Sequence, residues 1–214
     1  MLPVRQAAPR LTEGEYLQRE RAAEFRHVYL DGRVWAMAGE GIPHGKVSVN
    51  LVGLIHSQLK GKPCFALTKD TKVRSGPAGP RPVRLTKGLF SYPDVVVVCG
   101  EPEFLDEKTD VLLNPTAILE VLSPSTEGFD RREKFDRLER WNPSLSDYLL
   151  VSQDQARVEH FTRQTDGSWR YTKHVGLEAA CEVAAIGCRL PLAEVYDRVE
   201  FPAADADADD PAGG

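Results

Sequence analysis

Glu120 is the residue whose type and surroundings point most clearly to chemistry. It lies within Ala-Ile-Leu-Glu-Val-Leu, a run that otherwise has the composition of a core β-strand. Burying an unpaired carboxylate costs several kcal/mol. A buried Glu120 would therefore need a bound cation, a basic partner or a raised pKa. The simpler alternative is a strand-edge glutamate that points into solvent.

Asp94 is a second acid at the start of a strand. It follows Pro93 and precedes four consecutive valines. A proline is tolerated at the first position of a strand because its missing N–H is not needed there. We expect the Asp94 side chain at the mouth of this strand, beside the sheet and within reach of water. The alternative is a turn aspartate.

Lys134 lies in a helix that we predict from about Phe129 to Trp141. It shares an apolar stripe with Leu138 and Trp141, whereas the charged residues of this helix mostly occupy its other side. An ammonium group on the packing face of a helix requires a carboxylate or a phosphate nearby. The alternative is a lysine at the edge of the stripe whose head reaches solvent.

Taken together, two acids enter from two strands and a lysine enters from the helix after the second strand. Two neighbouring carboxylates suit a hard divalent cation such as Mg²⁺ or Mn²⁺. Such an ion polarises a phosphodiester and lowers the pKa of an attacking water, and the lysine could orient that water or stabilise developing charge. The pattern predicts metal-assisted phosphodiester hydrolysis with Asp94 and Glu120 as metal ligands. A purely structural Glu120–Lys134 ion pair remains an alternative.

Two further residues are supporting candidates for the catalytic site. His44 lies on the helical stripe of Val47 and Leu51, so it could hydrogen-bond substrate or a site acid, or it could be a helix-start histidine bonded to backbone. Asp70 lies in the strand-like run 64–73. It could be a third site acid, or an outward-facing aspartate paired with Lys72.

Basic side chains concentrate just before the Asp94 strand. A loop beside a metal site could follow a phosphate backbone with such residues, although a simple solvated loop has the same composition. Between positions 69 and 87 there is one acid, Asp70, and six basic residues: Lys69, Lys72, Arg74, Arg81, Arg84 and Lys87.

The remaining elements follow from local patterns. Thr12 to Glu15 is a capping box that predicts a helix running to about Phe25, and Asp31-Gly32 predicts a hairpin turn. Further patterns predict a helix over 44–60, strands over 64–73, 92–99 and 116–122, a meander of strands over 147–175, and a closing element over 181–201. Strands and helices mixed around one sheet indicate a single α/β (α+β) domain over 1–202. The acidic segment 203–214 cannot fold alone.

Composition limits the possible protein classes. The 214 residues carry a net charge of −5, which argues mildly against a strong non-specific DNA binder. No apolar run approaches the roughly 18 residues of a membrane span, and the N-terminal residues show no signal-type apolar core. We therefore expect a cytoplasmic protein. Its four cysteines form no CxxC pair and are expected to be reduced, buried thiols.

The sequence resembles a known family through His44 and six segments that occur in the family's order: YLDGRVWAMAG, DTKV, YPDVVVV, ILEVLSPST, DRREKF and PSLSDYLLV. It is similar to the Uma family of restriction-endonuclease-like proteins, within the PD-(D/E)XK nuclease superfamily. The resemblance covers about residues 12–201. It implies a restriction-endonuclease-like core, a mixed sheet flanked by helices with a C-terminal antiparallel meander, and a magnesium-dependent DNA nuclease.

By this resemblance Asp94 matches the aspartate of the PD motif and Glu120 matches the next acid. The usual lysine position, two residues after that acid, is Leu122 here, and Lys134 is the matching lysine on the helix. The DTKV segment favours a functional Asp70. One departure is Val28, where the family often has a glutamate that can help to bind metal, and Glu24 could substitute for it.

The leading hypothesis is a magnesium-dependent DNA endonuclease. The alternative is a catalytically inactive nuclease-fold module that binds nucleic acid or a protein partner, which Val28 and the net acidity favour. Many nucleases of this superfamily work as dimers, so a homodimer is a further expectation.

Overall fold

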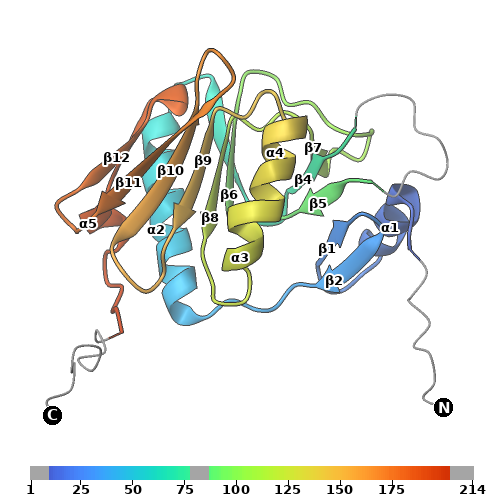
Figure 1. Cartoon of the computed structure of the whole chain (residues 1–214), viewed down its shortest axis with the longest axis horizontal. Coiled ribbons are helices and arrows are strands. Elements are labelled where there is room, and N and C mark those ends of the chain that lie inside the picture. Colours follow the sequence, from blue (N-terminus) through green and yellow to red (C-terminus); the bar gives the residue numbers. More distant parts are fainter. Residues whose placement is uncertain (1–9, 78–86, 203–214) are drawn as a thin grey trace, which may run out of the picture.

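The computed structural model describes residues 10–77 and 87–202, which form two β-sheets, a two-stranded hairpin and the helices between them (Figure 1). The larger sheet has six strands in the order β11-β10-β9-β8-β6-β3. Strands β8 and β9 run parallel, and the other neighbours are antiparallel. The strands are β3 (Cys64–Thr68), β6 (Val95–Cys99), β8 (Ala117–Val121), β9 (Asp147–Val151), β10 (Arg157–Arg163) and β11 (Trp169–Val175).

The second sheet has five strands in the order β2-β1-β5-β4-β7, which differs from the single sheet expected from the sequence. The run 64–73, expected as one strand, is broken by a turn in which the Thr71 N–H donates to the Thr68 carbonyl at 3.0 Å. The residues before this turn form β3 in the six-stranded sheet, and the residues after it form β4 in the five-stranded sheet. The five strands are β1 (His27–Leu30), β2 (Arg33–Ala36), β4 (Lys72–Ser75), β5 (Leu89–Ser91) and β7 (Val111–Leu112).

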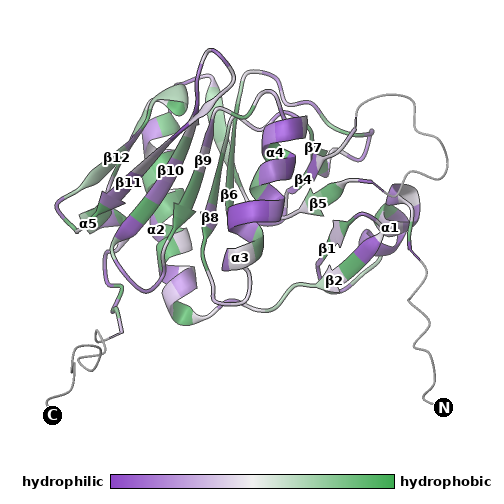
Figure 2. Cartoon of the chain, viewed as in Figure 1, coloured by the Kyte–Doolittle hydropathy of each residue, from purple (hydrophilic) through white to green (hydrophobic). Residues whose placement is uncertain are grey.

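Helices cover both faces of the six-stranded sheet. Helix α2 (Ile42–Leu59) packs on one face through Val47, Leu51 and Ile55. The other face is covered by a continuous helical segment made of α3 (Glu127–Phe129), a π-helical turn η1 (Asp130–Lys134) and α4 (Phe135–Trp141). In Figure 2 this segment is mostly hydrophilic and the strands behind it are hydrophobic, as expected for an amphipathic helix that packs one face on a sheet.

The N-terminal elements agree with their local signals. Thr12 caps α1 (Glu13–Glu20) in a capping box with Glu15, although the helix ends at Glu20 and not near Phe25. In the turn between β1 and β2, Asp31 has φ 48° and Gly32 has φ 87°, the positive values that a type I′ turn requires.

The C-terminal part also follows the expected order. Strands β9, β10 and β11 form the predicted meander. The closing element consists of β12 (Ala180–Val183), a 3₁₀ turn η2 (Ala184–Ile186), β13 (Cys188–Pro191) and the short helix α5 (Leu192–Val195). The predicted acidic segment 203–214 lies outside the described residues.

The expectation of four reduced cysteines is wrong for this structure. Cys64 of β3 and Cys99 of β6 lie directly opposite each other in the antiparallel register and form a disulfide. Cys181 and Cys188 are free and buried. The pairing joins residues 35 apart in the chain and depends on strand register, so cysteine spacing did not reveal it.

Counting thiols tests this pairing. Protein that has been equilibrated with glutathione disulfide and then denatured should titrate two thiols per chain, because only Cys181 and Cys188 are free. After full reduction it should titrate four. On the chain-entropy model, reduction should lower the free energy of unfolding by about 3–4 kcal/mol for a loop of this size. Four reactive thiols after the oxidising step would contradict the pairing.

Candidate active site

Strands β6 and β8 bring the two predicted acids together. Val95 pairs with Leu119 in their antiparallel register, so Asp94 at the start of β6 lies beside the end of β8. The Asp94 Oδ2 atom accepts a hydrogen bond from the Val121 N–H at 2.8 Å. The Asp94 side chain is 14% exposed, as expected for a residue at the mouth of its strand.

Glu120 and Lys134 meet inside the protein. Glu120 is 4% exposed and Lys134 is 5% exposed, so neither side chain lies at a solvent-facing edge. The Lys134 Nζ atom lies 2.6 Å from Glu120 Oε1. This contact confirms that Lys134 lies on the packing face of its helix and gives Glu120 the basic partner that a buried carboxylate requires.

Asp130 is a third acid of this cluster, which sequence reasoning did not identify. Its Oδ1 atom lies 3.2 Å from Lys134 Nζ, and its side chain is as buried as that of the lysine. The two residues are four apart in a helical segment, a spacing that could have revealed the pair. The Asp130 carbonyl also accepts a hydrogen bond from the buried Tyr148 hydroxyl at 3.0 Å, which fixes the π-helical turn against β9.

The cluster holds more carboxyl groups than ammonium groups. Burial is the largest effect on Glu120 and, with Asp130 and Asp94 nearby, it raises the pKa of Glu120 to about 8 despite Lys134. Burial opposes the charged form of Lys134, but Glu120 and Asp130 outweigh it and raise the pKa of Lys134 above its usual range. The lysine is therefore charged, and the site favours one added positive charge, either a proton on Glu120 or a metal ion.

His44 enters this site from the first turn of α2. Its Nε2 atom lies 3.4 Å from Asp94 Oδ2, and its Nδ1 atom lies 2.8 Å from Glu40 Oε2. Burial opposes the imidazolium form, but Asp94 outweighs burial and raises the pKa of His44 above its usual range. Its acidic partners are therefore Asp94 and Glu40, and the sequence did not single out Glu40.

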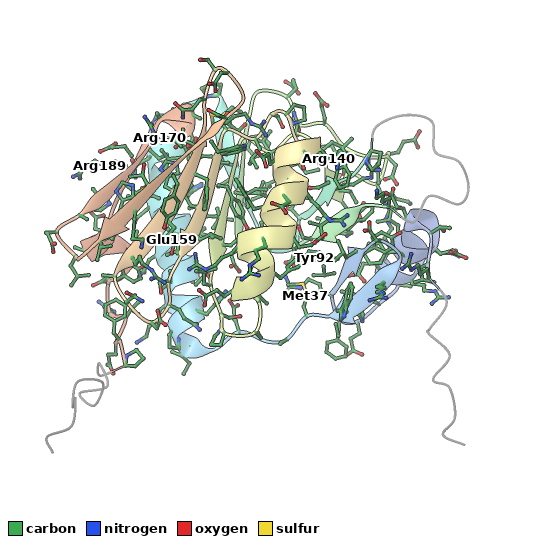
Figure 3. The ribbon with its side chains drawn as sticks, in the orientation of Figure 1. Met37, Tyr92, Arg140, Glu159, Arg170 and Arg189 are labelled. Carbon is green, nitrogen blue, oxygen red and sulfur yellow. A yellow bond between two sulfur atoms is a disulfide. The ribbon has the colours of Figure 1, made fainter. Side chains whose placement is uncertain are left out.

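A polar network holds the segment that leads to Asp94. The hydroxyl of Tyr92, two residues earlier, donates to Glu20 Oε1 at 2.6 Å. The backbone N–H of His27 donates to the same Glu20 oxygen at 2.8 Å. Tyr92 is labelled in Figure 3 between the six-stranded sheet and the β1–β2 hairpin. These bonds connect the Tyr-Pro-Asp segment to α1 and β1.

The structure does not bring Asp70 to this cluster. It lies in the turn between β3 and β4, its side chain is 88% exposed, and it pairs with Arg26 at 3.2 Å. The alternative of an outward-facing aspartate fits this geometry, although its partner is Arg26 and not Lys72. Lys72 instead lies 2.9 Å from Asp110.

The predicted basic loop is largely neutralised where it is described. Lys72 and Arg74 are buried, and Arg74 forms an ion pair with Glu13 at 3.0 Å. Lys69 contacts Glu40. Arg81 and Arg84 lie outside the described residues. A row of free cations beside the site is therefore not present over 69–77.

The position at which the family often has a glutamate contributes no metal-binding oxygen in this chain. Val28 is a half-buried residue of β1. Glu24 lies in the exposed segment between α1 and β1.

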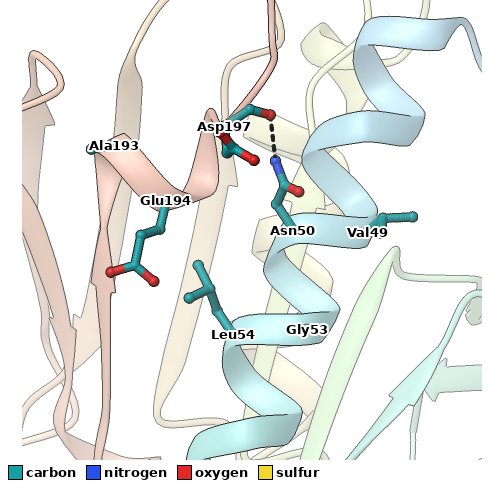
Figure 4. Close-up of a pocket in the computed structure, with 7 residues that line it drawn as sticks. All are labelled: Val49, Asn50, Gly53, Leu54, Ala193, Glu194 and Asp197. Carbon is teal, nitrogen blue, oxygen red and sulfur yellow. Dashed lines mark hydrogen bonds between the residues drawn. The ribbon is translucent and has the colours of Figure 1, made fainter.

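A groove between α2 and α5 lies apart from these acids. Figure 4 shows it, with Asn50 Nδ2 donating to the Asp197 carbonyl at 3.0 Å. None of the predicted site residues contributes to its lining, which consists of Val49, Asn50, Gly53, Leu54, Ala193, Glu194 and Asp197. The chemistry is therefore expected at the Asp94 end of the sheet and not in this groove.

The donor set fits a divalent metal ion. Asp94 and Glu120 offer carboxylate oxygens, the ligands that Mg²⁺ and Mn²⁺ prefer. The surplus of carboxyl groups over ammonium groups supplies the negative charge that such an ion would balance. Asp94 and Glu120 are thus the residues that would hold it.

Comparison with known proteins gives a family. The Uma2 family, described as "Putative restriction endonuclease", matches residues 14–193. The chain belongs to this family. The match covers the residues of all five predicted catalytic positions.

Two relatives and one solved structure extend this result. Two uncharacterized proteins of Synechocystis, slr1290 and sll1609, are 32% and 33% identical; the alignments cover 90% and 80% of this chain and 95% and 92% of theirs. The crystal structure of a "putative nuclease belonging to DUF820" from Anabaena variabilis has 16% identity and a TM-score of 0.68, and it covers 87% of this chain and 97% of that one. At 16% identity, the similarity to this solved structure supports the fold of the chain alone.

Removing the ionisable group of Glu120 should change how stability depends on pH. A raised carboxyl pKa means that the stabilising effect of the bound proton is complete at acidic pH and is lost as pH rises toward about 8. In buffer with EDTA, Glu120→Gln should therefore show a flatter decline in unfolding free energy between pH 5 and 9 than the wild type. Denaturant titrations measure this, with the exposed Asp70→Asn as control. Parallel curves for Glu120→Gln and the wild type would contradict the assignment.

Replacing Lys134 by methionine should cost stability at neutral and higher pH. The change leaves Glu120 and Asp130 buried without their cation, and breaking a buried pair in this way costs about 3–5 kcal/mol. The loss should shrink at pH 5, where the raised pKa of Glu120 keeps that carboxyl group protonated. Chemical denaturation at pH 5 and pH 8 measures both values beside Lys60→Met, an exposed control. A pH-independent loss would show that the lysine contributes packing alone.

Proposed function

We propose that this protein is a magnesium-dependent DNA endonuclease that hydrolyses phosphodiester bonds. The observation that carries the proposal is the buried contact of Lys134 with Glu120, with Asp94 fixed beside it at the end of β8. Family membership and the fold support this reading.

Asp94 and Glu120 would hold the metal ion through their carboxylates. When bound, Mg²⁺ supplies a Lewis acid that polarises the scissile phosphate and lowers the pKa of a coordinated water. The hydrogen bond from the Val121 N–H fixes Asp94, so its oxygens are oriented before an ion arrives.

Lys134 would act on the reacting groups through its charge. Its raised pKa keeps it cationic at neutral pH, so it can stabilise the negative charge that develops on the phosphate. Because it also contacts Glu120, it fixes that carboxylate in position. His44, hydrogen-bonded to Glu40 and next to Asp94, would orient Asp94 or donate to the substrate phosphate.

One observation favours the alternative of an inactive module that binds nucleic acid or a protein partner. Lys72 and Arg74, two of the basic residues that could have followed a phosphate backbone, form ion pairs with Asp110 and Glu13. The absence of an acid at Val28 points in the same direction.

A cleavage assay with matched variants decides between these functions. Supercoiled plasmid is incubated with the wild type, Asp94→Asn or Glu120→Gln, each purified identically, with Mg²⁺, Mn²⁺ or EDTA. We expect metal-dependent nicking by the wild type and a loss of at least about 100-fold in each variant, the scale typical for removing one group that stabilises the transition state. Asp70→Asn should cut within about twofold of the wild type, because Asp70 points away from the cluster.

The other outcomes are equally informative. Equal cutting by the wild type and Glu120→Gln would identify a contaminating nuclease and contradict the proposal. If no protein cuts a panel of plasmid, linear and single-stranded DNA but the wild type still shifts DNA in a gel, the binding module is supported. A strong loss of cleavage activity in Asp70→Asn would show that Asp70 contributes to the active site.

A further inference from the structure

A second cluster of metal-binding residue types lies in the C-terminal half of the chain. It consists of His160 of β10, His174 of β11 and Cys181 of β12, each of which places one ligand atom within 4.8 Å of the others. The Cys181 Sγ atom lies 3.4 Å from His160 Nδ1. The sequence gives no ligand spacing for this group, because the residues come from three different strands.

This cluster is separate from the acidic site. His160 pairs with Leu149 in register, and both face the core that α2 covers. Glu120 pairs with Leu150, the next residue along β9, so it faces the opposite side of the sheet. The sheet itself therefore lies between the two groups.

Asp147 completes an arrangement that is typical of metal-bound histidines. Its Oδ1 atom lies 2.7 Å from His160 Nε2, the ring nitrogen that does not face the cysteine. A carboxylate in this position fixes the tautomer and makes the other ring nitrogen a better ligand. Asp147 is 1% exposed, so its negative charge lies inside the protein.

His174 has a free ligand atom. Its Nε2 atom is buried and has no hydrogen-bond partner within residues 10–77 and 87–202. A buried polar atom without a partner costs free energy. Coordination of a cation by this nitrogen would remove that cost.

The order Cys181, His160, Asp147 also matches a nucleophile, its base and an orienting acid. Burial rules out this use. The nucleophile itself, Cys181, is 0% exposed, so a substrate carbonyl or phosphate cannot reach the sulfur. A small ion needs no such opening.

We propose that Cys181, His160 and His174 bind a zinc ion. Thiolate and imidazole are the ligands that zinc prefers, and in a tetrahedral site neighbouring sulfur and nitrogen ligands are about 3.5 Å apart, close to the observed contact. The thiolate and the Asp147 carboxylate together balance the charge of Zn²⁺. Three protein ligands leave the fourth position to a water molecule. The ion would tie β12 to the meander strands β10 and β11, and this role does not depend on the nuclease proposal.

Cobalt substitution tests this site with a readout that the acidic cluster cannot give. The full chain, with its Cys64–Cys99 disulfide intact, is dialysed against EDTA, kept free of oxygen and titrated with Co²⁺. A tetrahedral site with a cysteine ligand shows strong d–d bands and a thiolate-to-cobalt charge-transfer band, whereas a carboxylate site shows neither. We expect these bands to saturate at one equivalent of Co²⁺ and to be present also in Glu120→Gln and in Cys188→Ala, a matched control for a buried thiol.

Cys181→Ala should lose the charge-transfer band, and His174→Gln should bind Co²⁺ at least tenfold more weakly. Zinc should raise the melting temperature of the wild type and not that of His174→Gln. Because His174 is only half buried, this variant decides the question if Cys181→Ala does not fold. The proposal is overturned if no charge-transfer band forms, if the band survives in Cys181→Ala, or if His174→Gln binds as tightly as the wild type. In any of these cases the cluster is a hydrogen-bonded network alone.

Discussion

The contact between the Lys134 ammonium and the Glu120 carboxylate is the interaction on which the candidate active site depends. Moving two ions out of water costs several kcal/mol each, and a well-packed apolar pair is often as stable or more so. Stability therefore does not explain why charged groups occupy this part of the core. Asp130 adds a further acid to the same space, which leaves three carboxyl groups beside one ammonium group. A surplus of that kind fits a site that must bind a cation.

The geometry of the candidate active site follows from the crossover connection between β8 and β9. Strands β8 and β9 are parallel neighbours, so the chain must cross between their ends, and it does so through α3, η1 and α4. A helix in such a crossover packs directly on the strands it connects. Lys134 therefore lies over β8, where Glu120 projects, while Tyr148 of β9 holds the π-helical turn at Asp130. Asp94 comes from the antiparallel neighbour β6 and is fixed by the backbone of β8.

Local patterns predicted the features that depend on a few neighbouring residues. The Asp31-Gly32 turn, the capping box at Thr12 and the burial of Lys134 all follow from short-range spacing. The features that were missed depend on partners far apart in the chain. The disulfide of Cys64 depends on strand register over 35 residues, and Arg74 is neutralised by Glu13, which is 61 positions away. Periodicity predicts which side chains are buried, but it does not identify the residues they contact, so it could not separate two sheets from one.

The alternation of a β-strand places the two polar clusters on different faces of the same sheet. On β9, Asp147 faces the α2 side with His160, whereas Leu150 faces the α4 side beside Glu120. The cluster with His160 offers sulfur and nitrogen ligands, and the cluster with Glu120 offers carboxylate oxygens. Soft and borderline ligands select zinc and hard ligands select magnesium, so ligand chemistry and the sheet between them would keep the two proposed metal sites distinct. Because both clusters lie on the same six-stranded sheet, a structural ion on one face would support the neighbouring strands that carry the chemistry on the other.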